Sequence, residues 1–249
     1  MIFGERKTMP RVAVENAKVL LRDGLTHYLG GVPKWQDAYD EVADWLSDNK
    51  GKGLLTSGGM GLGKTRICLD VIPDILRSIG IEPFCVSAYA MSFGAYKEMT
   101  RFRAVVIDDV GTEDIASFYG ERHDLFKEIV DQAERKGIML IVTTNLDGKA
   151  LNERYGSRTV SRLFELVRPV RFEGQSLRGM KIEQPSYAYG IRFDTLEEAD
   201  RFADEQDAIR DGIENGSISL FDDWAQDAYE MHEALSLVDG MAYKYGRKS

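Results

Sequence analysis

Short runs of Val, Ile and Leu alternate with longer segments in which apolar residues recur every three or four positions. The apolar runs predict strands at residues 54–57, 83–88, 103–107, 138–143 and 167–172. The periodic segments predict helices at residues 12–23 (ending at Gly24), 35–47, 64–79, 123–136 and 150–166. Continuously apolar strands between helices are typical of a parallel sheet that is covered on both faces. The pattern therefore predicts an α/β fold with helices on both sides of the sheet.

Beyond about residue 180 the chain becomes acidic. Residues 195–213 carry apolar positions at helical spacing among many carboxylates, and residues 220–238 form a second helical candidate. Residues 1–193 hold 27 Lys and Arg against 26 Asp and Glu, whereas residues 194–249 hold 5 against 15. We therefore expect three parts, which are an N-terminal helical segment at 1–32, the α/β domain at 33–180 and an acidic helical appendage at 181–249.

The charge of the appendage bears on its role. A segment with a net charge of −10 should repel nucleic acid, while a nearly neutral domain can still carry a local basic stripe. Three roles remain open for the appendage: an electrostatic shield over the basic residues of the domain, a docking arm for a partner, or a structural cover packed on the domain.

The composition of the chain indicates the cellular compartment in which the protein works. No apolar run approaches the roughly 20 residues that a membrane-spanning helix needs, and charged residues stand where a signal peptide would be apolar. Cys68 and Cys85 lie in apolar contexts without metal-ligand spacing, so we expect free thiols. The sequence predicts a cytoplasmic protein with no membrane partner.

A glycine-rich loop lies between the strand at 54–57 and the helix that opens at Lys64. It matches G-x-x-x-x-G-K-[ST] in full: Gly58, Gly59, Met60, Gly61, Leu62, Gly63, Lys64 and Thr65. In this motif backbone N–H groups and the helix N-terminus bind phosphates, the lysine reaches the β- and γ-phosphates, and the hydroxyl binds Mg²⁺. We predict that these residues, with Arg66, bind ATP, and that Thr65 is a ligand of Mg²⁺.

Polar side chains end two later strands. The apolar strand at 104–107 leads into Asp108 and Asp109, and the next strand leads into Asn145. We expect Asp108 to hold Mg²⁺ through its water shell and Asp109 to polarise the attacking water, a role more often given to Glu. Because Asp is one methylene shorter, hydrolysis should be slow, or the water should sit differently. Asn145 can contact the γ-phosphate or orient that water.

Three arginines follow at four-residue spacing, which predicts one helix face: Arg154, Arg158 and Arg162. An arginine that acts on a neighbouring protomer stabilises the transition-state charge of the γ-phosphate, and catalysis then depends on a homo-oligomer. Arg158 and Arg162 are both candidates, and their spacing does not choose between them.

The motifs occur in the order GLLTSGGMGLGKT, AVVIDDVGTED, IVTTNL, YGSRTVSRLFE and VRFEGQSLR. Over roughly residues 33–178 they resemble the AAA+ ATPases of the DnaC/IstB family, which holds helicase loaders and the ATPase subunits of some transposons. The resemblance implies an AAA+/RecA-like P-loop NTPase that hydrolyses ATP. It also implies an ATP-switched oligomer that grips single-stranded DNA and acts on a replicative helicase in DNA replication. Matched by motif, Arg158 would be the arginine finger and Arg162 its close alternative.

Two features depart from that family. Only the 14 residues from Tyr89 to Phe102 separate the second strand from the Asp-Asp strand, which leaves room for one short helix where the family has a DNA-contacting helical element. Residues 1–32 are also few for a helicase-binding domain. Two alternatives to a helicase loader therefore stay open: an IstB-like transposition helper that assembles on duplex DNA, and a protein-remodelling or inhibitory ATPase without nucleic-acid contact.

Overall fold

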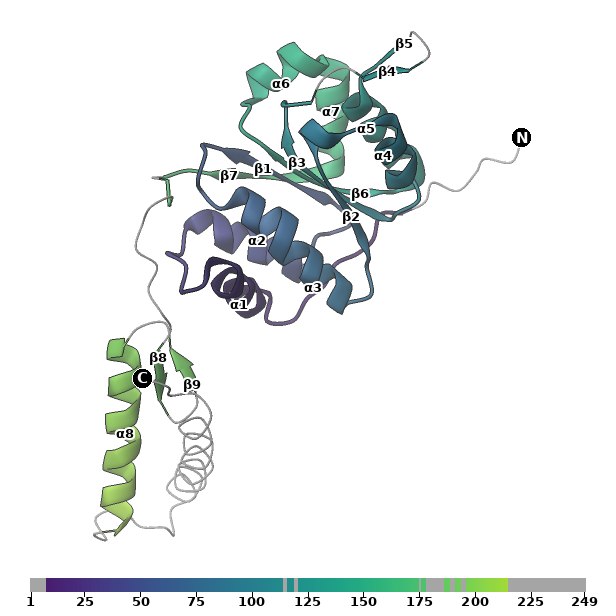
Figure 1. Ribbon diagram of the computed structural model, residues 1–249. Coiled ribbons are helices and arrows are strands. Elements are labelled where there is room, and N and C mark those ends of the chain that lie inside the picture. Colours follow the sequence, from purple (N-terminus) through teal and green to yellow (C-terminus); the bar gives the residue numbers. More distant parts are fainter. Residues whose placement is uncertain are drawn as a thin grey trace. The chain divides into compact units, whose positions relative to one another are not determined.

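The computed structural model describes residues 8–113, 116–118, 121–174, 176–177, 186–188, 191–193 and 196–214. The chain forms two compact units (Figure 1). The first comprises Met1–Leu29 with Pro33–Met180, and the second comprises Gly30–Val32 with Lys181–Ser249. The residues predicted to bind ATP and Mg²⁺ all belong to the first unit.

A five-stranded parallel sheet forms the centre of the first unit. Its strands are β1 (Gly53–Gly58), β2 (Pro83–Ser87), β3 (Ala104–Val110), β6 (Met139–Thr144) and β7 (Val167–Phe172). They lie in the order β2-β3-β6-β1-β7. Numbered within this sheet alone, the order is 2-3-4-1-5, which is that of AAA+ ATPases. The predicted fold class is confirmed.

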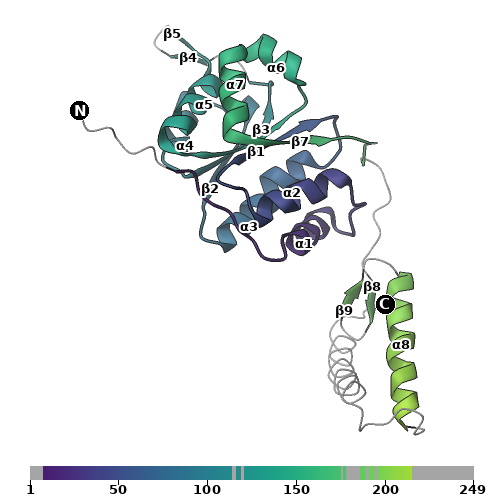
Figure 2. The same ribbon diagram turned by 180° about the vertical axis from the view of Figure 1, so that it is seen from behind.

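Helices cover both faces of the sheet (Figures 1 and 2). One face carries α1 (Ala17–Leu29), α2 (Asp37–Ser47) and a helix made of the π-helical turn η1 (Arg66–Val71) and α3 (Ile72–Ser78). The other face carries α4 (Phe93–Met99), α5 (Leu125–Lys136), α6 (Gly148–Tyr155) and α7 (Ser157–Leu166). Neighbouring residues of β1 illustrate the two cores, since Leu54 packs in one apolar cluster and Leu55 in the other. Burial on both sides explains the continuous apolar runs.

The N-terminal helix differs from its prediction. It was expected to end at Gly24, but α1 spans Ala17–Leu29. Residues 8–14 are in neither a helix nor a strand, residues 15–16 form a turn, and the Val14 N–H donates to the Leu46 carbonyl at 2.9 Å. A Cβ on Gly24 would lie 2.4 Å from Val71 Cγ1. The glycine therefore allows close packing of α1 against η1 and does not end the helix.

The region after β3 contains two features that the sequence pattern did not predict. The expected helix over 150–166 is divided into α6 and α7 by Gly156, which has φ +81°. Between β3 and α5, the strands β4 (Ala116–Phe118) and β5 (Glu121–His123) form an antiparallel hairpin.

The second unit has a hairpin and a long helix. β8 (Ser186–Ala188) pairs antiparallel with β9 (Ile191–Phe193), and α8 (Leu196–Glu214) packs against both strands. The acidic helix predicted at 195–213 is confirmed, and the helix predicted at 220–238 lies outside the described residues. Within the described ranges, no helix is both long and apolar enough to cross a membrane.

Candidate functional site

The glycine-rich loop connects the end of β1 to the helix that follows, and its shape depends on glycine. Gly58 has φ +131°, and a Cβ there would lie 2.0 Å from the Phe172 carbonyl oxygen in β7. Gly63 has φ +90°, and a Cβ there would lie 2.7 Å from the Tyr39 hydroxyl. Burial raises the pKa of Tyr39 to about 12, so its hydroxyl stays protonated and donates to the Leu62 carbonyl at 3.2 Å. Close contacts with Tyr39 of α2 and Phe172 of β7 thus fix the conformation of the loop.

The remaining loop residues differ in where their side chains lie. Met60 is 69% exposed. Arg66 forms an exposed ion pair with Asp70, at 2.8 Å, one turn further along its own helix. The carbonyl of Gly61 accepts a 2.8 Å hydrogen bond from the Leu177 N–H, so the segment after β7 contacts the loop. The contribution of Arg66 to ATP binding stays a prediction.

Lys64 lies almost fully buried at the mouth of the loop, with 5% of its surface exposed. Its ammonium donates to the carbonyls of Gly58 and Gly59 at 2.8 and 2.6 Å. It also donates to Asn145 Oδ1 at 3.0 Å. The ammonium therefore joins the loop to the end of β6.

A bulge in β3 arranges the two aspartates. Between Ile107 and Val110, β3 has one residue more than β6. Asp109 lies in this bulge with φ +56°, a left-handed conformation that Asp tolerates better than most residues. Its N–H donates to Thr143 Oγ1 at 2.8 Å, and the same hydroxyl donates to Asp108 Oδ1 at 2.6 Å. One threonine thus satisfies the N–H that the bulge removes from the sheet and orients the neighbouring carboxylate.

The Asp108 carboxyl is buried, and hydroxyl, carboxylate and ammonium groups lie near it. Burial raises the pKa of its carboxyl, and the charge of Asp109 acts in the same direction. Hydrogen bonds from Thr143 and Thr65 and the charge of Lys64 act in the opposite direction but do not cancel the increase. A carboxylate and a hydroxyl next to a lysine are the hard oxygen ligands that Mg²⁺ takes together with nucleotide phosphates. Thr65 and Asp108 therefore fit the predicted magnesium nucleotide.

Asn145 completes the arrangement at the carboxyl end of the sheet. It is exposed at the end of β6, where its Oδ1 accepts from Lys64 and its Nδ2 donates to Asp109 Oδ1 at 3.3 Å. Three separate segments of the sequence thus contribute to one hydrogen-bonded chain. The structure brings together these predicted residues: Lys64, Thr65, Asp108, Asp109 and Asn145.

The three arginines do not share a helix face, because Arg154 lies on α6 and the other two on α7. Arg162 donates to Asp131 and forms an ion pair with Glu134 at 2.6 Å, both on α5 of its own chain. Arg158 is exposed, and it has no hydrogen bond or ion pair to any residue that the structure describes. Of the two candidates for action on another protomer, only Arg158 has a guanidinium that forms no hydrogen bond or ion pair with the described part of the chain.

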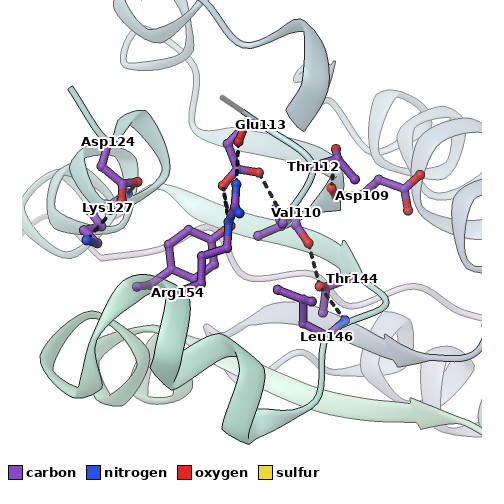
Figure 3. Close-up of polar contacts among 11 residues, drawn as sticks. Asp109, Val110, Thr112, Glu113, Asp124, Lys127, Thr144, Leu146 and Arg154 are labelled. Carbon is purple, nitrogen blue, oxygen red and sulfur yellow. Dashed lines mark hydrogen bonds and ion pairs between the residues drawn. The ribbon is translucent and has the colours of Figure 1, made fainter. Parts of the chain in front are cut away.

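Sequence reasoning missed a buried cluster around Glu113 (Figure 3). The Glu113 carboxylate is 6% exposed, accepts from the Gly111 N–H at 2.8 Å, and accepts from the Tyr155 hydroxyl. The guanidinium of Arg154 donates to the Glu113 carbonyl, and its Nε lies 3.5 Å from the carboxylate. The signal for this cluster was the Glu of the D-D-x-G-x-E pattern.

No family model matches the sequence, and no curated protein matches it. Among solved structures, the chain is similar to DnaI, with 19% identity and a TM-score of 0.49 over 65% of this chain and 93% of that chain. It is similar to the DnaC helicase loader, with 18% identity and a TM-score of 0.44 over 56% and 92%. It is also similar to replication initiator DnaA bound to AMPPCP and single-stranded DNA, with 16% identity and a TM-score of 0.42 over 84% and 62%. In structure the chain is similar to DnaI, the DnaC helicase loader and DnaA, in each case at low sequence identity.

Proposed function

We propose that this chain binds and hydrolyses ATP and works as an ATP-switched homo-oligomer. The observation that carries the proposal is the hydrogen-bonded chain from Lys64 through Asn145 to Asp109, which lies beside Asp108 at the end of the glycine-rich loop. It unites a phosphate-binding cation, a magnesium ligand and a base within reach of one another.

Binding would begin at the loop. Its backbone N–H groups and the helix N-terminus would take the phosphates, and the Lys64 ammonium would exchange its carbonyl contacts for β- and γ-phosphate oxygens. Thr65 and Asp108 would hold Mg²⁺, which supplies positive charge to the phosphate oxygens during phosphoryl transfer. Because burial already disfavours the ionised form of Asp108, a bound cation would relieve an electrostatic cost that exists before binding.

Hydrolysis would use Asp109 as the group that orients and deprotonates water. Its carboxylate is half-buried, and the Asn145 amide donates to one of its oxygens. The bulge sets the direction of this side chain, as bulges do next to many active sites. When a phosphate takes the ammonium of Lys64, the Asn145 carbonyl oxygen becomes available to the attacking water.

The arginine for the γ-phosphate would come from another protomer. Arg158 is exposed and uncommitted among the described residues, whereas Arg162 is neutralised by two carboxylates of α5. An Arg158 placed on the γ-phosphate of a neighbour would make hydrolysis depend on assembly. This dependence is what an ATP-switched oligomer requires.

We assign the oligomer to DNA replication, as a cytoplasmic helicase loader that acts on a replicative helicase and single-stranded DNA. The support is the order of motifs, which resembles the DnaC/IstB family over roughly residues 33–178. An IstB-like helper that assembles on duplex DNA has the same ATPase motifs and stays an alternative.

One observation favours the remaining candidate, a protein-remodelling or inhibitory ATPase that does not contact nucleic acid. Between β2 and β3 the chain has only the short 3-10 turn η2 (Ala88–Ala90) and the seven-residue helix α4. This leaves little surface for the DNA-contacting element that the family carries there.

Fluorescence anisotropy of labelled single-stranded and duplex oligonucleotides, with and without Mg·ATP, separates these candidates. ATP-dependent binding of the single strand is the expected result, and preferential binding of the duplex would support the IstB-like helper. Failure to bind either DNA at low salt, where phosphate contacts are strongest, would support the protein-directed ATPase.

A further inference from the structure

The segment after the Asp-Asp pair folds into a tight turn that reaches Glu113 (Figure 3). The Thr112 hydroxyl donates to the Asp109 carbonyl at 2.8 Å, and the Gly111 N–H donates to Glu113 Oε2 at 2.8 Å. Gly111 has φ +110°, and a Cβ there would lie 2.7 Å from Leu146 Cδ1. The turn is therefore closed by its own hydrogen bonds and packed against the residue after Asn145, so residues 109–113 should move as one piece.

Glu113 joins this turn to the end of α6. Its buried carboxylate accepts from the Tyr155 hydroxyl and lies 3.5 Å from Arg154 Nε, while another nitrogen of Arg154 donates to the Glu113 carbonyl. The Tyr155 ring packs on Phe126 with centroids 4.7 Å apart. Burial, together with the hydrogen bond to Glu113, raises the pKa of Tyr155, so the hydroxyl remains a donor. A buried Glu113 carboxylate that lost these hydrogen-bond donors would raise the free energy of the folded state. Glu113 therefore holds Tyr155 and Arg154 in place.

Tyr155 is also the last residue of α6, and α7 begins at Ser157 after the left-handed Gly156. Arg158 lies in the first turn of α7, three residues beyond Tyr155. We propose that Glu113 is a positioning residue that couples the nucleotide site of a protomer to the helix from which the same protomer presents Arg158 to its neighbour.

The coupling rests on the proposed function, and it adds the path by which ATP in one protomer would control hydrolysis in its neighbour. A γ-phosphate and its water would set the position of Asp109, the closed turn would carry that position to Glu113, and Glu113 would hold the end of α6. Arg158 would then reach the neighbouring site mainly when its own protomer holds ATP. By thermodynamic reciprocity, a docked Arg158 would favour ATP in its own protomer.

Mixed oligomers test the coupling. Acceptor protomers carry Arg158→Ala and so have an intact nucleotide site. Donor protomers carry Asp109→Asn, which removes the base but keeps the size of the side chain and an acceptor for Asn145, and so have an intact Arg158 and an intact turn. Adding Tyr155→Phe to the donor removes the hydroxyl but keeps the ring, and any effect must act through Arg158 because the donor site is already inactive. We expect about tenfold lower kcat, the size expected when one buried hydrogen bond to a charged group is lost, with unchanged KM for ATP.

The matched control is Tyr28→Phe in the donor, which removes a tyrosine–carboxylate hydrogen bond to Asp74 away from the site. This donor should restore activity as fully as Asp109→Asn alone. Equal restoration by the Tyr155→Phe donor would overturn the coupling. Glu113→Gln, which keeps an acceptor for Tyr155, should restore more activity than Glu113→Ala in the same donor.

Hydrogen exchange of the full chain gives a readout that does not need hydrolysis. Mg·ATP should slow exchange in α7 of the wild type and of Tyr28→Phe, but not of Tyr155→Phe. If calorimetry shows that ATP binds while exchange in wild-type α7 does not change, the coupling is wrong and the ATP site stands. If ATP does not bind at all, the proposed function fails, and the coupling fails with it.

Discussion

The ammonium of Lys64 donates a 3.0 Å hydrogen bond to Asn145 Oδ1, across the adjacent ends of β1 and β6. The other end of the same amide donates to Asp109. In the proposed mechanism, a phosphate that replaced Asn145 as a partner of Lys64 would free the amide at the place where water would attack. This one contact would then link nucleotide binding to the arrangement of the proposed hydrolytic groups.

Lys64→Ala should weaken ATP binding by about 100-fold, because a charge-assisted contact to phosphate is lost from a buried position. Isothermal titration calorimetry measures the change. Lys52→Ala, an exposed lysine at the opposite end of β1, should bind as the wild type does. Undiminished affinity of Lys64→Ala would remove the glycine-rich loop from the proposed site.

Asn145→Ala should lower kcat by about tenfold or more with little change in KM for ATP, since the amide orients Asp109 and water and does not anchor the nucleotide. Asn152→Ala is the control, because Asn152 is an exposed residue of α6 whose side chain, among the described residues, bonds only its own helix backbone at Gly148. A steady-state ATPase assay gives both constants. A large rise in KM with unchanged kcat would assign Asn145 to binding instead.

Asp108→Asn should abolish the Mg²⁺-dependent part of ATP affinity and stabilise the nucleotide-free protein at neutral pH. The pKa of Asp108 is raised on folding, so the folded state binds a proton more readily than the unfolded state. Stability therefore falls as pH rises from the ordinary to the raised pKa, and it stays lower above that interval. We expect Tm to rise by about 2 °C in the variant at neutral pH.

Thermal denaturation at neutral and at acidic pH checks this sign. The advantage of Asp108→Asn should shrink as the wild-type carboxyl becomes protonated. A variant that is less stable at neutral pH, or that binds Mg·ATP as the wild type does, would contradict the assignment.

Mixing Asp109→Asn protomers with Arg158→Ala protomers should restore part of the ATPase activity that each lacks, because one intact composite site can form. The specific activity of the wild type should also rise with protein concentration. Arg162→Ala should behave differently and lower Tm, since it leaves Asp131 and Glu134 on α5 without their shared cation. A monomer with concentration-independent activity would defeat the proposed oligomer.

Deleting residues 181–249 should leave ATP affinity unchanged, because every residue of the proposed site belongs to the first compact unit. If the acidic appendage is a shield, the truncated chain should bind single-stranded DNA more tightly, most visibly at low salt. If it is a docking arm, DNA affinity should stay the same and capture of a helicase should be lost. A truncated chain that unfolds would show that the appendage is a structural cover.

The sequence by itself determined the features that depend on local sterics and periodicity. The sequence pattern predicted all five strands of the parallel sheet. It is most continuously apolar in β3, β6 and β1, because these central strands are buried on both faces, whereas the edge strands β2 and β7 are partly exposed. Gly58 and Gly63 identified the loop, because no larger residue fits at their backbone angles and contacts. The order of the motifs also placed Asp108 and Asn145 at neighbouring strand ends, since parallel strands end on the same edge of a sheet.

Tertiary structure decided which distant side chains meet. Thr143 serves both aspartates only because a bulge places an extra residue of β3 beside it. Arg158 and Arg162 both belong to the series of arginines at four-residue spacing. α5 packs beside α7, however, and among the described residues its carboxylates pair with Arg162 and not with Arg158. Glu113 and Tyr155 are 42 residues apart, and no local pattern records that one buries a carboxylate against the hydroxyl of the other. Such pairs depend on how helices and strands pack, which periodicity along a single chain does not encode.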